Sequence, residues 1–289
     1  SLMSNYADNF GVGKENNDES IFELQFRPDL INTSVAPGTS SSGLWFEPRS
    51  IAPAGIPCQG SGEGVNNNWV LDAFKASVDA NGNIDSRAFG TLLFDDSKVQ
   101  KKTGDDVKLF GGQLFKDFYT TGKFPGKGVN YTACNRKWLD FTLTQSQFQG
   151  SARNNGVNYR YIRYADVLLM YAESLIKSGA TAGATSGVSA LAAVNMVRQR
   201  PSVNLPALTA VTLDAVKAER VLELTNEGHR FYDLLRWGEL ASRFKYLEDN
   251  DPYFKQFTSY IKFSAKDAYM PLPLVELSAN PQAKQNDGW

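Results

Sequence analysis

Residues 160–179 read RYIRYADVLLMYAESLIKSG, and this stretch decides the fold class. Its apolar residues recur three, four and seven positions apart, which places them on one side of an α-helix. Residues 188–200 show the same period and end at Pro201, a residue that stops a helix. A short link of small residues, 179–187, joins the two stretches. The sequence therefore predicts an antiparallel helical hairpin over residues 161–200 and a mainly α fold.

The hairpin is similar to one tetratricopeptide unit, although its link is longer than that repeat allows. Downstream, the sequence predicts helices over 212–226 and 229–247, separated near Gly228. Upstream, it predicts a strand over 20–26, helices over 70–76 and 86–94, and strands over 113–119 and 137–142. Gly, Pro, Ser and Asn cluster over 30–68 and predict long loops. We expect a loop-rich lobe (1–160), a helical part (161–248) and an ordered tail (249–289).

Composition excludes several classes of function. The chain carries 30 Lys and Arg against 31 Asp and Glu, so no charge surplus exists to bind a nucleic acid. No apolar run approaches the roughly 20 residues of a membrane-spanning helix. One histidine, His229, and two distant cysteines, Cys58 and Cys134, cannot complete a zinc site. We predict no metal and no cofactor, place His229 at a helix end or in the core, and leave a Cys58–Cys134 disulfide open.

The densest charged pattern is ERVLELTNEGHRFYDLLRW, residues 219–237. Its acids and arginines recur three and four residues apart, which indicates an ion-pair network on one helix face. In this interpretation Glu223 and Glu227 face arginines one turn away, Arg220 and Arg230. The alternative is a pair of catalytic carboxylates, but arginine partners lower a carboxylate pKa and glycosidic cleavage requires a raised one. We predict a structural role for this run and no catalytic residues.

Residues 79–85, DANGNID, resemble the start of a calcium-binding loop because oxygen-bearing side chains occupy alternate positions. The glycine falls at the fourth position of the loop and not at the sixth. Gly90 stands where such a loop requires a bidentate glutamate. We predict an Asx-rich turn, with a minor calcium site as the alternative.

Aromatic residues stand among Asn, Gly and Ser in the loop-rich lobe. Trp45 lies in GLWFEPR, where the neighbouring prolines place its indole on a loop. Flat aromatic rings can stack on the apolar faces of sugars while polar neighbours bond the hydroxyl groups. We predict that the ligand-binding residues are Trp45, Phe46, Arg49, Trp69 and Tyr131. Core packing is the alternative for Trp69 and, with equal weight, for Trp45.

Several blocks together resemble the SusD/RagB family. They are YRYIRYADVLLMYAESLIKSG, AVNMVRQR, ERVLELTNEGHRFYDLLRWG and PLPLVELSANPQAKQNDGW, in this order. Two earlier blocks, NYADNF…ENNDESIFELQF and NNNWVLDAFKASVDANGNIDSRAFGTL, agree with the family's order as well. The resemblance spans essentially the whole chain and implies a tetratricopeptide-like helical body with an irregular lobe of long loops and short strands.

The resemblance also implies a function. Members of the family are surface-exposed outer-membrane lipoproteins of Bacteroidetes that bind nutrients, chiefly glycans, without catalysis. They deliver the ligand to a SusC-like TonB-dependent transporter. The matched blocks are framework, because ligand residues in the family come from variable loops. The family's lipid anchor and helical N-terminal half are missing here, so we expect this chain to represent the C-terminal half, with the N-terminal half as a partner.

The favoured function is therefore non-catalytic binding of an oligo- or polysaccharide, or another nutrient, at the cell surface, followed by delivery to the transporter. One alternative is a helical scaffold that binds a peptide or protein, as tetratricopeptide-like grooves allow. A less favoured alternative is a glycoside hydrolase that uses the region of Glu223 and Glu227. Specificity depends on loop geometry, so the sequence does not predict which glycan is bound.

Overall fold

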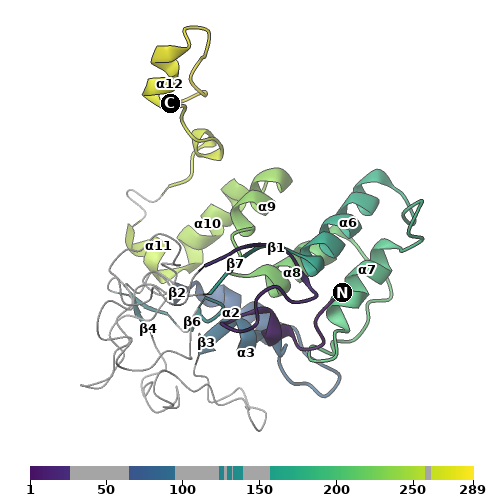
Figure 1. The fold of residues 1–289 in the computed structure, drawn as a ribbon. Coiled ribbons are helices and arrows are strands. Elements are labelled where there is room, and N and C mark those ends of the chain that lie inside the picture. Colours follow the sequence, from purple (N-terminus) through teal and green to yellow (C-terminus); the bar gives the residue numbers. More distant parts are fainter. Residues whose placement is uncertain (27–64, 95–123, 127–128, 132, 139–156, 258–261) are drawn as a thin grey trace. The chain divides into compact units, whose positions relative to one another are not determined.

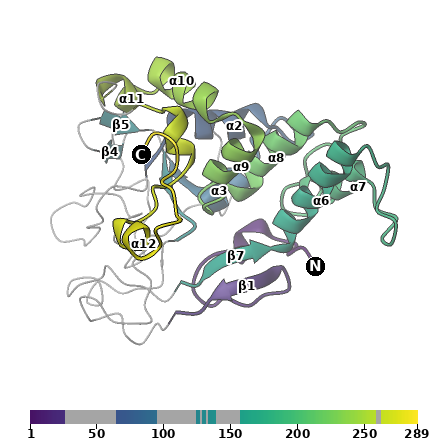
Figure 2. The same ribbon diagram turned by 90° about the horizontal axis from the view of Figure 1, so that it is seen from above.

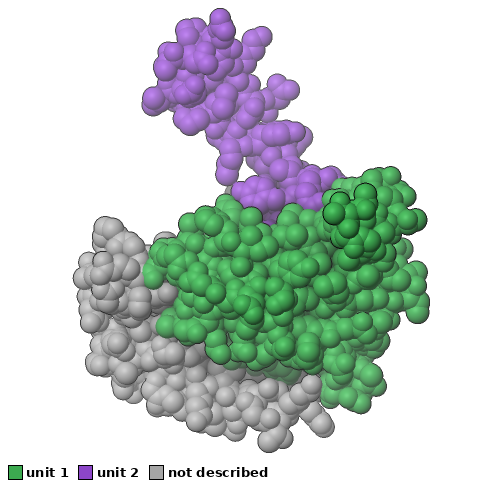
Figure 3. Space-filling view, turned by 45° about the vertical axis from the view of Figure 1, so that its right-hand side comes forward, with its two compact units in different colours: residues 1–227 green, residues 228–289 purple. Residues whose placement is uncertain are grey.

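The structure, a computed structural model, describes residues 1–26, 65–94, 124–126, 129–131, 133–138, 157–257 and 262–289 (Figure 1). Within these ranges helices are the main elements, which confirms the predicted mainly α fold. The chain divides into two compact units, Ser1–Glu227 and Gly228–Trp289, which Figure 3 colours separately. No helix in the described ranges is long and apolar enough to cross a membrane.

Three helices form the body of the first unit: α6 (Tyr164–Ser178), α7 (Ala190–Arg198) and α8 (Leu213–Leu224). Helix α6 packs against both α7 and α8 (Figure 1). Ala165, Ala172 and Ala193 are completely buried between the helices, and their small side chains let the backbones approach closely. The predicted helical hairpin is confirmed, with α8 as a third member.

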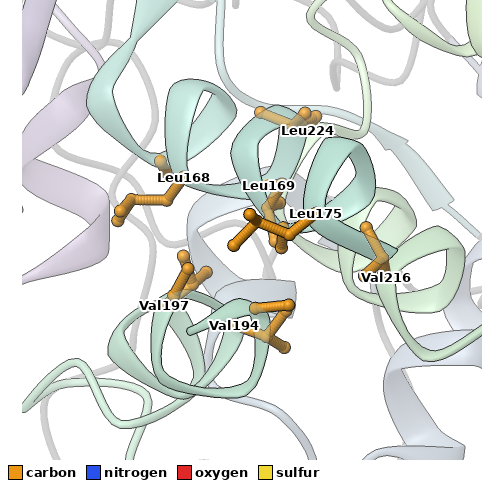
Figure 4. Close-up of a cluster of buried hydrophobic side chains, with 11 residues drawn as sticks. Leu168, Leu169, Leu175, Val194, Val197, Val216 and Leu224 are labelled. Atoms are coloured by element: carbon orange, nitrogen blue, oxygen red, sulfur yellow. The ribbon is translucent and has the colours of Figure 1, made fainter. Parts of the chain in front are cut away.

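Buried aliphatic side chains fill the space between these three helices, and Figure 4 shows them converging. The labelled members are Leu168, Leu169, Leu175, Val194, Val197, Val216 and Leu224. Full burial of a side chain of this size contributes about 1.5–3 kcal/mol. A helical hairpin alone leaves one side of each helix uncovered, so α8 is needed to complete this core.

The ends of these helices follow from local chemistry. Gly179 ends α6 in the left-handed conformation, with φ of 71°, which glycine adopts without strain. The side chain of Ser189 accepts a hydrogen bond from the backbone N–H of Ala192 and so caps α7. Thr212 caps α8 in the same way through Ala215.

The beginning of the first predicted helix is wrong. Tyr159–Arg163 form strand β7, which pairs antiparallel with β1 (Ser20–Leu24) and leads directly into α6, as Figure 2 shows. The spacing of Ile162 and Ala165 fits a helix, but these residues are also the end of an alternating strand and the start of the helix. Pairing with β1 satisfies the backbone groups on the facing edges of the two strands and decides the outcome. It also confirms the strand predicted over 20–26.

The remaining elements of the first unit are short. They are the 3₁₀ turn η1 (Tyr6–Asn9), helices α2 (Asn68–Ala76) and α3 (Arg87–Thr91), and strands β2 (Val65–Asn66), β3 (Leu92–Phe94), β4 (Phe124–Gly126), β5 (Val129–Tyr131) and β6 (Ala133–Asn135). Strands β2, β6 and β3 form a sheet in this order, and β4 pairs with β5. A second core surrounds Phe74, which is completely buried between α2, α3 and β3.

Two predictions in this region need correction. The helix predicted over 86–94 ends at Thr91, and its last three residues form β3, because they pair with β6. The strand predicted over 137–142 begins as a turn at Lys137 and Trp138. Its other residues, the predicted strand over 113–119 and most of the predicted loop over 30–68 lie outside the described residues.

The second unit contains α9 (Arg230–Trp237), α10 (Leu240–Asn250), α11 (Pro252–Phe257), η4 (Ala265–Ala268) and α12 (Leu274–Ala279). The single helix predicted over 229–247 is wrong, because Gly238 takes a left-handed conformation with φ of 72° and ends α9. The tail was predicted as ordered coil and carries the short elements η4 and α12 as well. Its last residue, Trp289, donates its indole N–H to the carbonyl oxygens of Lys266 and Tyr269.

Candidate functional site

Glu223, in the last turn of α8, lies at the centre of a buried cluster of charged side chains. Its carboxylate accepts hydrogen bonds from Arg87 at 2.9 Å, Arg200 at 2.8 Å and Arg163 at 3.1 Å. All four side chains are buried. The arginines come from α3, from the segment after α7 and from β7, so one α8 side chain connects three other segments.

Glu227, one turn further along the chain, extends this cluster. Lys137 donates to its Oε1 at 2.6 Å, and Arg163 forms a bidentate pair with it at 2.7 and 2.8 Å. The two-pronged geometry of a guanidinium and a carboxylate is the strongest form of such a pair. Arg163 also donates to Glu19 at 2.5 Å, so it joins three carboxylates. Arg87 likewise joins three carboxylates, those of Asp85, Glu219 and Glu223.

The connected members form a network, which we call the buried ion network. Its carboxylates are Asp85, Glu19, Glu219, Glu223 and Glu227, and its cations are Arg87, Lys137, Arg163, Arg198 and Arg200. The two groups are equal in number, so the formal charge of the network is zero. Ionised groups tolerate burial only when paired in this way, and removing one partner leaves a buried charge uncompensated.

The pKa values follow from these pairs. Burial alone would raise the pKa of Glu223, yet the guanidinium groups of Arg200, Arg163 and Arg87 outweigh burial and hold it well below its ordinary value. Burial also opposes ionisation of Glu227, but Arg163 and the neighbouring lysine outweigh it and lower the pKa. Both carboxylates are ionised at neutral pH. Neither has the raised pKa that a general acid for glycosidic cleavage needs.

Aromatic rings cover the lysine of the network. The Nζ atom of Lys137 lies 4.6 Å from the centre of the Phe10 ring and 5.3 Å from that of Tyr6. Burial lowers the pKa of Lys137 to about 8, against the attraction of Glu227. Both rings belong to the NYADNF block near the start of the chain. This block therefore shields the network from water.

The interpretation of residues 219–237 as an ionic network is confirmed, and the network reaches well beyond the helix face that predicted it. Arg220 donates to Asp166 of α6 at 2.8 Å. Within the described ranges, the carboxylates of Glu223 and Glu227 bind cations that are distant in sequence. The helix α8 ends before Glu227, so that residue and Arg230 do not share one continuous helix. Helical spacing therefore predicts that an ionic network exists but does not predict these long-range partners.

The two smaller motifs agree with their structural interpretations. His229 is the residue before α9 and is half-buried, so it lies at a helix end as predicted. Asp79 accepts hydrogen bonds from the backbone N–H groups of Asn81 and Asn83 at 2.8 and 2.9 Å, which confirms the Asx-rich turn. Among the described residues, no group of three or more His, Cys, Asp or Glu side chains could hold a metal ion.

The structure describes only some of the predicted ligand residues. Trp45, Phe46 and Arg49 lie outside the described residues. The backbone of Tyr131 ends β5 and pairs with Phe124. Trp69 is half-buried in α2 and packs against the second core. The role of these five residues in ligand binding stays a prediction.

Sequence reasoning missed a series of aromatic rings along the β1–β7 ribbon. Trp138, 2% exposed, stacks on Tyr159 with the ring centres 4.9 Å apart. Tyr159 contacts Tyr161 at 5.7 Å, and Tyr161 contacts Phe22 at 6.0 Å. The alternation in YRYIR and SIFEL was a usable signal, because residues two apart on a strand share a face. The helical assignment of residues 160–163 concealed it.

Comparison with known proteins places this fold in a class. Residues 18–289 match the sequence model of the SusD family. A SusD-like protein of Formosa agariphila is 26% identical over 99% of this chain and 51% of its own length. A SusD-like protein of Bacteroides ovatus is 33% identical over 86% of this chain and 38% of its own length. The chain thus spans about half or less of the length of these curated relatives.

Solved structures of SusD-type proteins also resemble this chain. A SusD superfamily protein from Bacteroides vulgatus superimposes with a TM-score of 0.67 at 27% identity, over 100% of this chain and 55% of that one. A laminarin-binding SusD-like protein gives 0.64 at 26%, over 100% and 54%. Surface glycan-binding protein A from Bacteroides thetaiotaomicron in complex with laminarihexaose gives 0.65 at 25%, over 99% and 56%. The helical body is that of a SusD-type protein, and the chain belongs to the SusD family.

Proposed function

We propose that this chain is the ligand-binding part of a cell-surface protein that binds oligo- or polysaccharides without cleaving them. One observation carries the proposal: the chain belongs to the SusD family and is similar, over 99% or more of its length, to a laminarin-binding SusD-like protein and to a surface glycan-binding protein in complex with laminarihexaose. The ligand class that these neighbours favour is a neutral glucan. Specificity is proposed to reside in the loop-rich lobe, with Trp45, Phe46, Arg49, Trp69 and Tyr131 as its contacts.

The division between framework and loops supports this proposal. Glu23, buried and hydrogen-bonded to Asn158, lies shortly before residue 27, where the first long stretch outside the described residues begins. Lys137 lies shortly before residue 139, and Arg160 shortly after residue 156. Buried charged side chains therefore fix the chain close to the points where it enters or leaves the loop segments outside the described residues. Binding residues are commonly carried on loops that a rigid body positions.

The absence of catalysis in this proposal also has a physical basis. Glu223 and Glu227, the carboxylates that the hydrolase alternative would use, are buried and ionised and pair with cations of the buried ion network. A glycosidase needs one carboxyl group that keeps its proton near neutral pH. Binding without cleavage is the simpler consequence of this arrangement.

Family membership extends the proposal beyond this chain. We propose that the protein lies at the outer membrane of a Bacteroidetes bacterium, exposed at the surface and anchored by a lipid. Its proposed partners are a SusC-like TonB-dependent transporter, which receives the ligand, and the N-terminal half of the same protein. The comparison with longer curated relatives supports a larger whole protein.

Isothermal titration calorimetry with three neutral hexasaccharides tests the proposal: laminarihexaose, maltohexaose and xylohexaose. We expect binding of laminarihexaose, with weaker or no binding of the other two, and no release of reducing sugar during prolonged incubation. The Trp45→Ala variant should bind the preferred hexasaccharide more weakly if the lobe carries the site. Release of reducing sugar, or no binding of any glycan by the folded chain, would contradict the proposed function.

A further inference from the structure

Two aromatic rings are exposed side by side on the β1–β7 ribbon. Phe22 of β1 is 50% exposed and Tyr161 of β7 is 54% exposed. Their ring centres lie 6.0 Å apart with the planes at 67°. Large aromatic side chains gain stability from burial, so two of them in water at one place mark a surface suited to contact with another molecule.

A fixed support holds these rings. Tyr161 contacts Tyr159, which stacks nearly parallel on the buried indole of Trp138, at 17°. The indole N–H donates to the carbonyl oxygen of Asn226 at 2.7 Å, and the hydroxyl group of Tyr159 donates to that of Glu227 at 3.1 Å. The exposed rings thus end an aromatic series that is anchored next to the buried ion network. A pre-oriented ring loses little conformational freedom when a ligand binds.

The exposed part of the ribbon is uncharged. Its exposed side chains are Ile21, Phe22, Leu24 and Tyr161. The charged side chains of the same two strands, Glu23, Arg160 and Arg163, are buried. This distribution matches a neutral partner with apolar faces, such as a glucan chain, whose sugar rings have apolar C–H faces. The two strands expose no cation that could pair with an acidic polysaccharide.

Along the chain, the ribbon also adjoins the loop segments that flank it, one of which carries the predicted ligand residue Trp45. Strand β1 ends at Leu24, shortly before the segment that contains Trp45. Strand β7 begins at Tyr159, shortly after the segment that ends at residue 156. A ligand held by the lobe would therefore have an aromatic surface available at the point where the lobe joins the framework.

We propose that Phe22 and Tyr161 form a stacking platform for a neutral glucan chain, as an extension of the lobe site. This inference rests on the proposed function. It departs from the expectation that the matched blocks are framework alone, because it assigns ligand contacts to two residues of those blocks. The platform takes the apolar faces of sugar rings, and the hydroxyl group of Tyr161 is available to a sugar hydroxyl. Long glucans would use both the lobe and the platform, whereas short ones would not reach both.

Calorimetry on the folded chain tests the platform with laminarihexaose. We expect Phe22→Ala and Tyr161→Ala each to weaken binding about tenfold, because anchoring aromatics carry a large share of binding energy. Tyr161→Phe keeps the ring and should stay within about threefold of the wild type. Tyr269→Ala, which removes an aromatic ring that is 64% exposed in the second unit, is the matched control and should leave binding unchanged.

A second measurement does not depend on the folding of the alanine variants. The chain labelled with 3-fluorotyrosine gives a fluorine resonance for Tyr161, identified as the one that Tyr161→Phe lacks. Adding laminarihexaose should shift this resonance and not that of Tyr269. If laminarihexaose binds while the Tyr161 resonance and the affinities of the alanine variants stay unchanged, the platform is wrong and the proposed function stands. A folded wild-type chain that binds none of the three hexasaccharides overturns both.

Discussion

The charged run 219–237 forms two kinds of ion pair, which are long-range and buried in its first half and local and partly exposed in its second half. In the first half, Glu223 binds arginines that lie 23 to 136 residues away in sequence, and all of these groups are buried. In the second half, Asp233 binds Arg236 three residues further on, and the side chain of Arg236 is 37% exposed. The same kind of pattern thus gave a long-range network in one helix and a local pair in the next.

The difference shows what helical spacing can and cannot predict. A local pair needs only the geometry of one helix, so sequence spacing predicts it, and it contributes little because water competes for both groups. A buried pair forms between segments that the fold brings together. Breaking it leaves a buried charge that neither a partner nor water stabilises. The four predictions that follow separate the two kinds of pair, from the largest expected effect to the smallest.

The largest loss is expected for Arg163→Met. This substitution removes the cation that joins Glu19, Glu223 and Glu227, and leaves excess negative charge in a buried site. We expect the free energy of unfolding to fall by about 4 kcal/mol, measured by urea denaturation. A loss below about 1 kcal/mol would show that the network does not couple these segments.

Acid should weaken the fold through the same groups. The folded-state pKa values of Glu223 and Glu227 lie below the ordinary 4.5, so their contribution is present above pH 4.5 and is lost as pH falls through the folded-state values. We expect a loss on the order of 3 kcal/mol between pH 5 and pH 3, measured by urea denaturation at each pH. The Glu223→Gln variant, which lacks one of these groups, should lose less over the same range. Equal slopes for the two proteins would contradict the assignment.

Lys137→Met should cost less than the arginine variant, about 2 kcal/mol at pH 7, because Arg163 still pairs with Glu227. The variant also changes the pH dependence. Burial lowers the folded-state pKa of Lys137 to about 8 from 10.5, so between these values the unfolded chain binds a proton that the folded chain has lost. Wild-type stability should therefore rise in this range through this group, and the gap to the variant should widen from pH 7.5 to 9.5. A constant gap would mean that Lys137 titrates normally.

The smallest loss is expected for Arg236→Ala in the second half of the run. Its pair with Asp233 is partly exposed and local, so we expect a change of about 0.5 kcal/mol or less by urea denaturation. A matched comparison with Arg163→Ala sets the scale for an arginine that is buried. A loss as large as that of the buried arginine would remove the distinction between the two kinds of pair.

The helical body could be predicted from the sequence because each helix carries its own signal. The periodic apolar residues of α6, α7 and α8 face one core, and Ser189 and Thr212 stand at the caps that local chemistry requires. Strand β7 carries an ambiguous signal, because the alternation in YRYIR overlaps the helical spacing of the residues that follow it. Its pairing with β1, more than a hundred residues earlier in the chain, decides between the two.

The candidate site was predicted less well for a related reason. Ligand contacts in the lobe depend on how loops are placed, which periodicity does not encode, and Trp45 lies outside the described residues. The partners of Glu223 were missed because Arg87 and Arg200 approach it only in the folded chain. The break at Gly238 was missed because a glycine within a helical pattern does not by itself reveal a left-handed conformation.

The central claim is that the buried ion network stabilises the fold while glycan binding occurs elsewhere. The most direct test is the Glu227→Gln variant, measured for melting temperature and for laminarihexaose affinity at a temperature where it remains folded. We predict a melting temperature lower by about 5 °C or more and an affinity within about twofold of the wild type. An unchanged melting temperature with abolished binding would contradict the claim and return Glu227 to the functional site.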